Sequence, residues 1–164
     1  MPKKTLVKVF AALAVLAIVF ASITTLGGDD TVSGSAAGLP AVTANAGEAP
    51  TITPPTGEAP ATLQTQDIIV GTGTEVLPTS TLTVHYTLMS WSSGEILESS
   101  WTSGQPATFP LSGVIAGWQE GLPGTKVGGR RLLVIPPSLG YGPMAGHPLE
   151  KETLIFTVDI IAVS

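Results

Sequence analysis

The fold is decided by residues 114–142, which read VIAGWQEGLPGTKVGGRRLLVIPPSLGYG. An apolar pair leads into a very short helical segment that carries Trp118. Pro123 ends that segment, because a proline lacks the amide hydrogen and crowds the preceding turn. A strand is expected over Arg130 to Ile135, followed by a loop that presents Tyr141 between two glycines. Indole, phenol and aliphatic groups gathered in so short a stretch are typical of a small apolar pocket with a few polar groups.

The clearest strand outside this stretch is Ser80 to Met89, in which apolar and polar side chains alternate with period two. The alternation predicts that Tyr86 points inward and that His85 lies on a solvated face. Arg130 and Arg131 are interpreted as a solvated strand start. Further strands are expected at Asp67 to Gly71, Glu95 to Trp101, Thr108 to Leu111 and Thr153 to Val163. This pattern of five or six strands and one short helix predicts an α+β fold with a mainly antiparallel sheet.

Residues 1–26 have the composition of a targeting segment. The segment opens with a positive region formed by Lys3, Lys4 and Lys8. The apolar run from Val9 to Ala21 then fits a signal peptide cleaved after Ala21, but its weak extension to Leu26 keeps an uncleaved membrane anchor open. In both cases the lysines stay in the cytoplasm and the rest is exported. We therefore expect the N-terminus to contact the membrane, and the protein to be secreted or anchored to the cytoplasmic membrane.

Residues 27–65 are interpreted as a linker rich in proline, glycine, alanine and threonine. The motif GEAP occurs twice, at Gly47–Pro50 and Gly57–Pro60, and no apolar periodicity is present. A segment that can bury so little apolar surface is expected to stay disordered. The remaining residues, 66–164, are then one folded domain of an ordinary size.

Composition excludes several classes of function. The formal net charge is −5 and no basic stripe is present, so nucleic acid is not an expected partner. The chain has no cysteine, which excludes disulfides, thiol catalysis and zinc–thiolate sites. The two histidines, His85 and His147, are too few for a metal cluster, so no metal and no cofactor is expected. Nothing in the sequence predicts an oligomer, and we expect a monomer.

A series of short blocks resembles one protein family. The blocks are Val84-His85-Tyr86, Gly94 with Leu97-Glu98-Ser99-Ser100, Val114-Ile115-Ala116-Gly117-Trp118, Gly121, Gly140-Tyr141-Gly142 and Thr153-Leu154-Ile155-Phe156. In this order they are similar to the FKBP-type peptidyl-prolyl cis-trans isomerases, over about residues 66–164. The signal-plus-linker layout resembles exported bacterial members.

The resemblance implies a bent antiparallel sheet of five or six strands wrapped around one short helix, with the site between them. Trp118 would be the floor under a substrate proline, and the backbone N–H of Ile115 and the hydroxyl of Tyr141 would bind carbonyl groups. The catalytic residues implied are Tyr86, Glu98, Trp118 and Tyr141. The substrate-binding residues implied are Leu97, Val114, Ile115, His147 and Phe156, with Tyr86, Leu97 and Phe156 as walls.

Three departures from the family pattern affect the walls of this site. Leu97 stands where the family usually has phenylalanine, and Glu98 stands where it usually has aspartate. An aromatic residue often found in the region of Ala107 is missing. The loop over residues 148–152 is shorter than usual, and Leu149 is a candidate replacement for a missing isoleucine contact. These changes bear on the catalytic rate and on affinity for macrolide inhibitors.

The function implied is isomerisation of X-Pro bonds in proline-containing client polypeptides outside the cytoplasm. This reaction makes and breaks no covalent bond, so it needs no nucleophile, metal or redox group. The alternative is a non-catalytic chaperone module that holds proline-containing segments. The altered Leu97, Ala107 and the short loop over residues 148–152 keep that alternative open.

Overall fold

The computed structural model describes residues 38–164. The predicted targeting segment, residues 1–26, and the first part of the predicted linker, residues 27–37, lie outside the described residues. The strands are β1 Gln64–Ile69, β2 Thr81–Ser90, β3 Ile96–Ser99, β4 Ala107–Pro110, β5 Arg130–Ile135 and β6 Leu154–Val163. One α-helix, α1 Ala116–Gly121, and three 3₁₀ turns at Ser100–Thr102, Leu111–Gly113 and Pro137–Leu139 complete the described elements.

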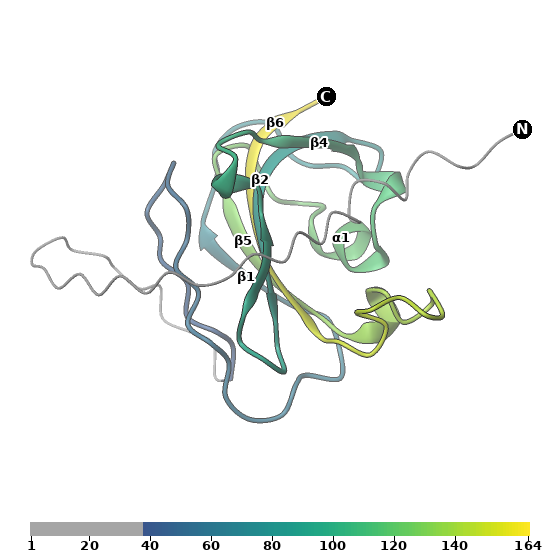
Figure 1. Ribbon diagram of the computed structural model, residues 1–164. Helices are drawn as coiled ribbons and strands as arrows, with labels where there is room; N and C mark the ends of the chain where they lie inside the picture. Colours follow the sequence, from purple (N-terminus) through teal and green to yellow (C-terminus); the bar gives the residue numbers. More distant parts are fainter. Residues whose placement is uncertain (1–37) are drawn as a thin grey trace, which may run out of the picture.

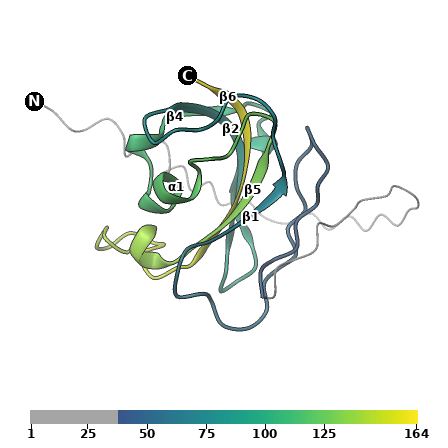
Figure 2. The ribbon, with the colours of Figure 1, turned by 180° about the vertical axis from the view of Figure 1, so that it is seen from behind.

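The six strands form one antiparallel sheet. Its order is β1-β5-β6-β2-β3, and β4 pairs with the start of β2. Figure 1 shows α1 against one face of this bent sheet, which we call the inner face, and the segment that leads into β1 against the other, outer face. The view from behind in Figure 2 shows the same two sides. The predicted α+β fold, an antiparallel sheet around one short helix, is confirmed.

Period-two alternation puts four apolar side chains of β2 on the inner face, in the core cluster that also contains Trp118 of α1, namely Leu82, Val84, Tyr86 and Leu88. Tyr86 is 4% exposed and lies in the main core cluster with Trp118, so the predicted inward orientation is confirmed. The helix approaches the sheet closely, because two of its residues are glycines. A Cβ at Gly117 would lie 2.5 Å from the side chain of Ile135, and a Cβ at Gly121 would overlap the side chain of Leu133.

The prediction that His85 is solvated is wrong. His85 is buried on the outer face, with its Nδ1 2.9 Å from the Ser100 hydroxyl and its ring stacked on Trp101 at 4.0 Å. β3 was expected to continue to Trp101, but it ends at Ser99 and a 3₁₀ turn carries Ser100 and Trp101 over the imidazole. The polar residue at this strand position is therefore covered by the next element of the chain.

The prediction of a disordered linker is also wrong for the residues that the structure describes before β1. Val42 and Ile52 form an isolated antiparallel bridge and are 1% and 5% exposed. They join a second apolar cluster on the outer face. Two buried aliphatic side chains and a set of backbone hydrogen bonds hold this segment on the sheet. A segment can therefore be ordered without the long apolar periodicity that the sequence analysis looked for.

Arg130 was interpreted as solvated, and this is wrong because the same segment covers it. Its guanidinium is 0% exposed and makes a bidentate ion pair with Asp159, with both N–O distances at 2.8 Å. Arg131 is partly buried and pairs with Asp67 on β1. Burial raises the pKa of the Asp159 carboxyl, while the hydrogen bonds and charge of Arg130 act in the opposite direction.

Candidate functional site

The inner face carries a box of four aromatic rings, each from a different element. Trp118 of α1 meets Phe156 of β6 at a ring-centroid distance of 5.3 Å and Tyr86 of β2 at 5.9 Å, both edge to face. Phe109 of β4 meets Trp118 at 6.0 Å with an interplanar angle of 85°. Such edge-to-face pairs are the preferred geometry for aromatic rings in a core. The box is a buried apolar cluster built from residues far apart in sequence.

Phe109 belongs to this box and was missed by the sequence analysis. The family pattern predicts an aromatic side chain in the region of Ala107, and the sequence analysis interpreted this residue as missing from the site. Phe109 lies two residues further along β4, so it faces the same way as Ala107 and is 7% exposed. Its period-two relation to Ala107 was the signal that could have found it.

Two tyrosines and one carboxylate form the polar part of the candidate site. The hydroxyl of Tyr86 donates a hydrogen bond of 2.6 Å to Oε1 of Glu98 on β3. The loop after the third 3₁₀ turn presents Tyr141, whose ring stacks on the imidazole of His147 at 4.0 Å and 5°. Nδ1 of His147 accepts the backbone N–H of Leu149, which fixes the orientation of the ring.

The start of α1 adds one backbone donor. Ile115 is the N-cap residue and is 8% exposed, and its carbonyl accepts the amides of Trp118 and Gln119. Within residues 38–164, no protein group accepts a hydrogen bond from the Ile115 amide. Val114, just before it, is partly buried and packs against the core cluster that contains the aromatic box. The first turn of a helix leaves such amides for other partners.

Of the nine predicted site residues, the structure brings eight together on or beside the inner-face core. These are Tyr86, Glu98, Val114, Ile115, Trp118, Tyr141, His147 and Phe156. Leu97 is 44% exposed and is not part of the core cluster. Leu149 does pack against that cluster, as the sequence analysis suggested for the missing isoleucine contact. The short loop after His147 therefore contributes an apolar contact that the exposed Leu97 does not.

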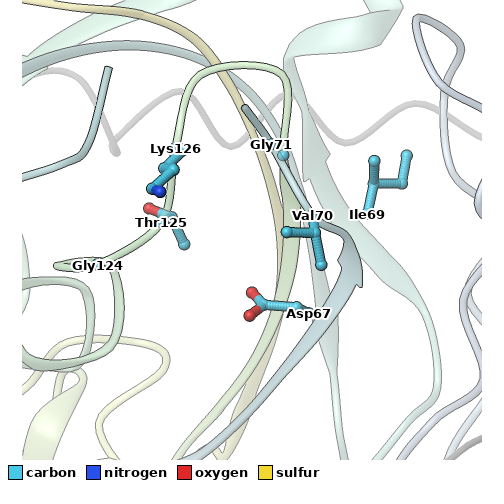
Figure 3. A pocket seen from close by; sticks show the side chains of 8 residues that line it. Asp67, Ile69, Val70, Gly71, Gly124, Thr125 and Lys126 are labelled. Atoms are coloured by element: carbon cyan, nitrogen blue, oxygen red, sulfur yellow. The ribbon is translucent and has the colours of Figure 1, made fainter. Parts of the chain in front are cut away.

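A separate surface pocket of about 230 Å³ contains none of the predicted site residues. Figure 3 shows its two walls, the end of β1 with Val70 and Gly71, and the loop from Gly124 to Lys126. Of the lining residues, Asp67, Val70, Gly124 and Lys126 are exposed, whereas Thr125 is buried. This pocket lies at the β1–β5 edge of the sheet, away from the residues of the candidate site.

Two features bear on cofactors and membranes. Among residues 38–164, no group of three or more histidine, aspartate or glutamate side chains could hold a metal ion. Within the same residues, no helix is long and apolar enough to cross a membrane.

The family follows from a sequence comparison. A family model described as FKBP-type peptidyl-prolyl cis-trans isomerase matches residues 73–161, which is more than half of the chain. The chain belongs to this family. The matched residues run from the turn before β2 almost to the end of β6, so they include every residue of the candidate site.

Individual relatives agree with this assignment. A probable FK506-binding protein of Corynebacterium glutamicum is 55% identical over 97 residues, covering 58% of this chain and 82% of the relative. The isomerase FkpA of Escherichia coli is 41% identical over 102 residues, covering 60% of this chain but only 36% of FkpA. The chain is therefore a peptidyl-prolyl cis-trans isomerase of the FKBP type.

Solved structures of the family have the same fold. The crystal structure of FkpA from Escherichia coli matches with a TM-score of 0.57 at 38% identity, covering 62% of this chain and 48% of that one. The crystal structure of AtFKBP13 matches with a TM-score of 0.54 at 30% identity, covering 65% of this chain and 96% of that one.

Both tyrosines should resist ionisation until the domain unfolds. The pKa of Tyr141 is raised to about 12, mainly by burial and to a smaller extent by the charge of the Glu98 carboxylate. The pKa of Tyr86 is also raised, mainly by burial and to a smaller extent by the hydrogen bond to Glu98. Unfolded tyrosines ionise near pH 10, so above that pH the folded state binds more protons and stability falls as pH rises. The free energy of unfolding should be insensitive to these groups below pH 10 and then fall by up to about 1.4 kcal/mol per pH unit for each tyrosine.

Urea unfolding at several pH values, with tyrosinate absorbance recorded in parallel, measures this effect. The chain has only two tyrosines, so the absorbance reports on Tyr86 and Tyr141 alone. Tyrosinate that forms near pH 10 while the domain is still folded would contradict the assigned environment of one or both hydroxyls.

Proposed function

We propose that the chain isomerises X-Pro bonds of polypeptides outside the cytoplasm, and that the aromatic box is where it does so. The observation that carries the site is the convergence of Tyr86, Trp118 and Phe156 in one core cluster with Ile115 and Tyr141. The lysine-rich apolar segment over residues 1–26 supports export. We also propose that the protein acts as a monomer, with its N-terminal segment contacting the membrane.

The proposed mechanism needs only a site that favours the twisted amide over the planar one. Amide resonance sets a barrier of about 18–20 kcal/mol to rotation of the peptide bond. The planar amide is the more polar form, so apolar walls around the C–N bond disfavour it relative to the twisted state. The proline ring would lie on Trp118, and the Ile115 amide would donate to a substrate carbonyl. The hydroxyl of Tyr141, kept protonated by its raised pKa, would donate to a second carbonyl.

Tyr141→Phe should lower the isomerase rate without unfolding the domain. The change removes one hydroxyl and keeps the ring that stacks on His147. A hydrogen bond of this kind contributes about 0.5–1.5 kcal/mol, which corresponds to roughly 2- to 12-fold in kcat/KM. The measurement is the rate of cis–trans exchange of a short X-Pro peptide, with the thermal midpoint recorded for the same sample. An unchanged rate would remove the Tyr141 hydroxyl from the proposed mechanism.

The same assay separates catalysis from the non-catalytic alternative. A protein that suppresses aggregation of an unfolded client while leaving the exchange rate of the peptide at its uncatalysed value would be a holding chaperone. Addition of a macrolide inhibitor should abolish the acceleration if the inhibitor takes the same site. Cell fractionation and the intact mass of the full chain test the location and whether residues 1–21 are removed.

A further inference from the structure

The outer face of the sheet binds a segment of the chain that the family model does not include. We call residues 39–57 the strap. The strap buries Val42 and Ile52 against apolar residues of four strands and the turn after β2, namely Ile68, Met89, Trp91, Leu132, Val134 and Ile155. We call these six residues, together with Arg130, the outer-face patch. The strap precedes the matched residues 73–161, whereas the patch lies almost wholly within them.

Arg130 is the polar centre of this contact. A guanidinium has five N–H donors, and all five of Arg130 have partners. Two go to Asp159. The other three go to the strap, namely to the carbonyl of Thr43 at 2.9 Å, the side-chain oxygen of Asn45 at 2.9 Å and the carbonyl of Glu48 at 2.6 Å.

The chemistry of these partners defines the kind of ligand that the patch takes. Asp159 already neutralises Arg130, so the remaining donors suit neutral oxygens, such as backbone carbonyls, better than a second carboxylate. A second donor, Nε1 of Trp91, binds the carbonyl of Gly57 at 3.2 Å. Each GEAP motif thus supplies one carbonyl, Glu48 from the first and Gly57 from the second, to a different donor of the patch.

The strap also makes hydrogen bonds within itself. The amide of Thr43 donates to Thr51 and that of Thr53 donates to Ala41, so the two arms pair across the Val42–Ile52 bridge. Asn45 closes the turn between them through its bonds to Thr43 and Ala49. Prolines at positions 40, 50, 54 and 55 further restrict the unbound segment. A restricted segment loses less entropy on binding than a free chain does.

We propose that the outer-face patch is a second polypeptide-binding site, separate from the isomerase site, and that the strap is its occupant in cis. Its ligand class is an extended, proline-containing segment that presents two apolar side chains and a turn of backbone carbonyls. The strap covers the face of the sheet opposite α1 (Figures 1 and 2), so it leaves the face that carries the aromatic box uncovered by its own residues. A tethered occupant acts at an effective concentration in the millimolar range, so it excludes competing segments even when its intrinsic affinity is weak.

The test uses the full chain and a fluorescent peptide with the sequence of residues 38–58. Ile52→Asp places a charge in the buried contact of the strap and should free the patch. Thr53→Asp is the matched control, because it adds the same charge at the neighbouring, exposed position. The Ile52→Asp chain should bind the peptide at least about tenfold more tightly than the wild-type and Thr53→Asp chains, in which the patch is filled. The same peptide carrying Ile52→Asp should not bind.

Two outcomes of the peptide experiment would overturn the proposal. No binding to a folded Ile52→Asp chain would mean that the patch is not a polypeptide site. Equal binding to all three chains would mean that the prolines of the peptide engage the isomerase site instead. Retained isomerase activity shows that the Ile52→Asp chain is folded.

Hydrogen exchange decides the matter if the Ile52→Asp chain does not fold. In the wild-type chain the amides of Thr43 and Thr53 should exchange at least about 100-fold more slowly than in an unstructured peptide. Asn45→Ala, a milder change that removes one bond to Arg130, should speed both amides without loss of isomerase activity. Exchange at the unprotected rate in the wild-type chain would overturn the proposal, whatever the isomerase assay shows.

Discussion

Replacing Trp118 with alanine should lower the isomerase rate of the folded protein by roughly 10- to 150-fold. The indole is 1% exposed and meets each of the other three rings of the aromatic box edge to face. If it is the floor under the substrate proline, its loss removes about 1.5–3 kcal/mol of apolar contact that the pocket provides. The cavity left in the core should also reduce the free energy of unfolding by about 3–5 kcal/mol.

Trp91→Ala is the matched control for this prediction. Trp91 is also a buried tryptophan, but it lies on the outer face under the strap. Its replacement should cost comparable stability and leave kcat/KM per folded molecule unchanged. If both variants lose activity in proportion to their loss of stability, Trp118 is only a core residue and the site assignment fails. Chemical denaturation gives the folded fraction needed for this comparison.

Replacing Arg130 with methionine should destabilise the protein by about 3–5 kcal/mol, because it leaves Asp159 buried without its cation. Three strap groups lose their donor at the same time. Burial already raises the pKa of Asp159, and removing the opposing charge of Arg130 should raise it further. The free energy of unfolding of the variant should therefore increase as the pH is lowered from 7 and Asp159 becomes neutral.

Arg131→Met provides the comparison, since Arg131 also pairs with an aspartate through two hydrogen bonds. That pair is partly exposed, with side chains 16% and 42% accessible, so its loss should cost only about 0–1 kcal/mol. Urea unfolding of the two variants measures the difference. Equal costs for Arg130→Met and Arg131→Met would show that the Arg130 guanidinium is solvated and that the strap does not cover it.

The inner face of the sheet could be predicted from the sequence because its signals are local. Tyr86 follows from period-two alternation along β2, and the position of Trp118 follows from a short helix that ends before Pro123. The family blocks then supplied the roles that we propose for Ile115 and Tyr141, which hydrophobic periodicity does not indicate. Phe109 was not predicted because the family pattern has its aromatic residue in the region of Ala107, whereas here the ring is two residues further along the same face of β4.

The outer face could not be predicted because its partner lies far away in the chain. A threonine-rich strand face beside two arginines is the usual pattern of a solvated surface. Here the strap groups that bind Arg130 lie 82 to 87 residues before it, and the strap adds the buried aliphatic side chains of Val42 and Ile52. Its composition is that of a disordered linker, and its order comes from its own backbone hydrogen bonds, these two side chains and the hydrogen bonds to Arg130. The strap and the outer-face patch are too far apart in sequence for a local pattern to include both.

Catalysis at the aromatic box is tested by measuring the exchange rate of an X-Pro peptide with purified wild-type protein and with Trp118→Ala and Trp91→Ala at equal folded concentrations. The uncatalysed bond exchanges over tens to hundreds of seconds. We predict that the rate rises in proportion to the concentration of the wild-type and Trp91→Ala proteins and rises far less with Trp118→Ala. A rate that stays at the uncatalysed value with the wild-type protein, or that rises equally with all three, would contradict catalysis at the aromatic box.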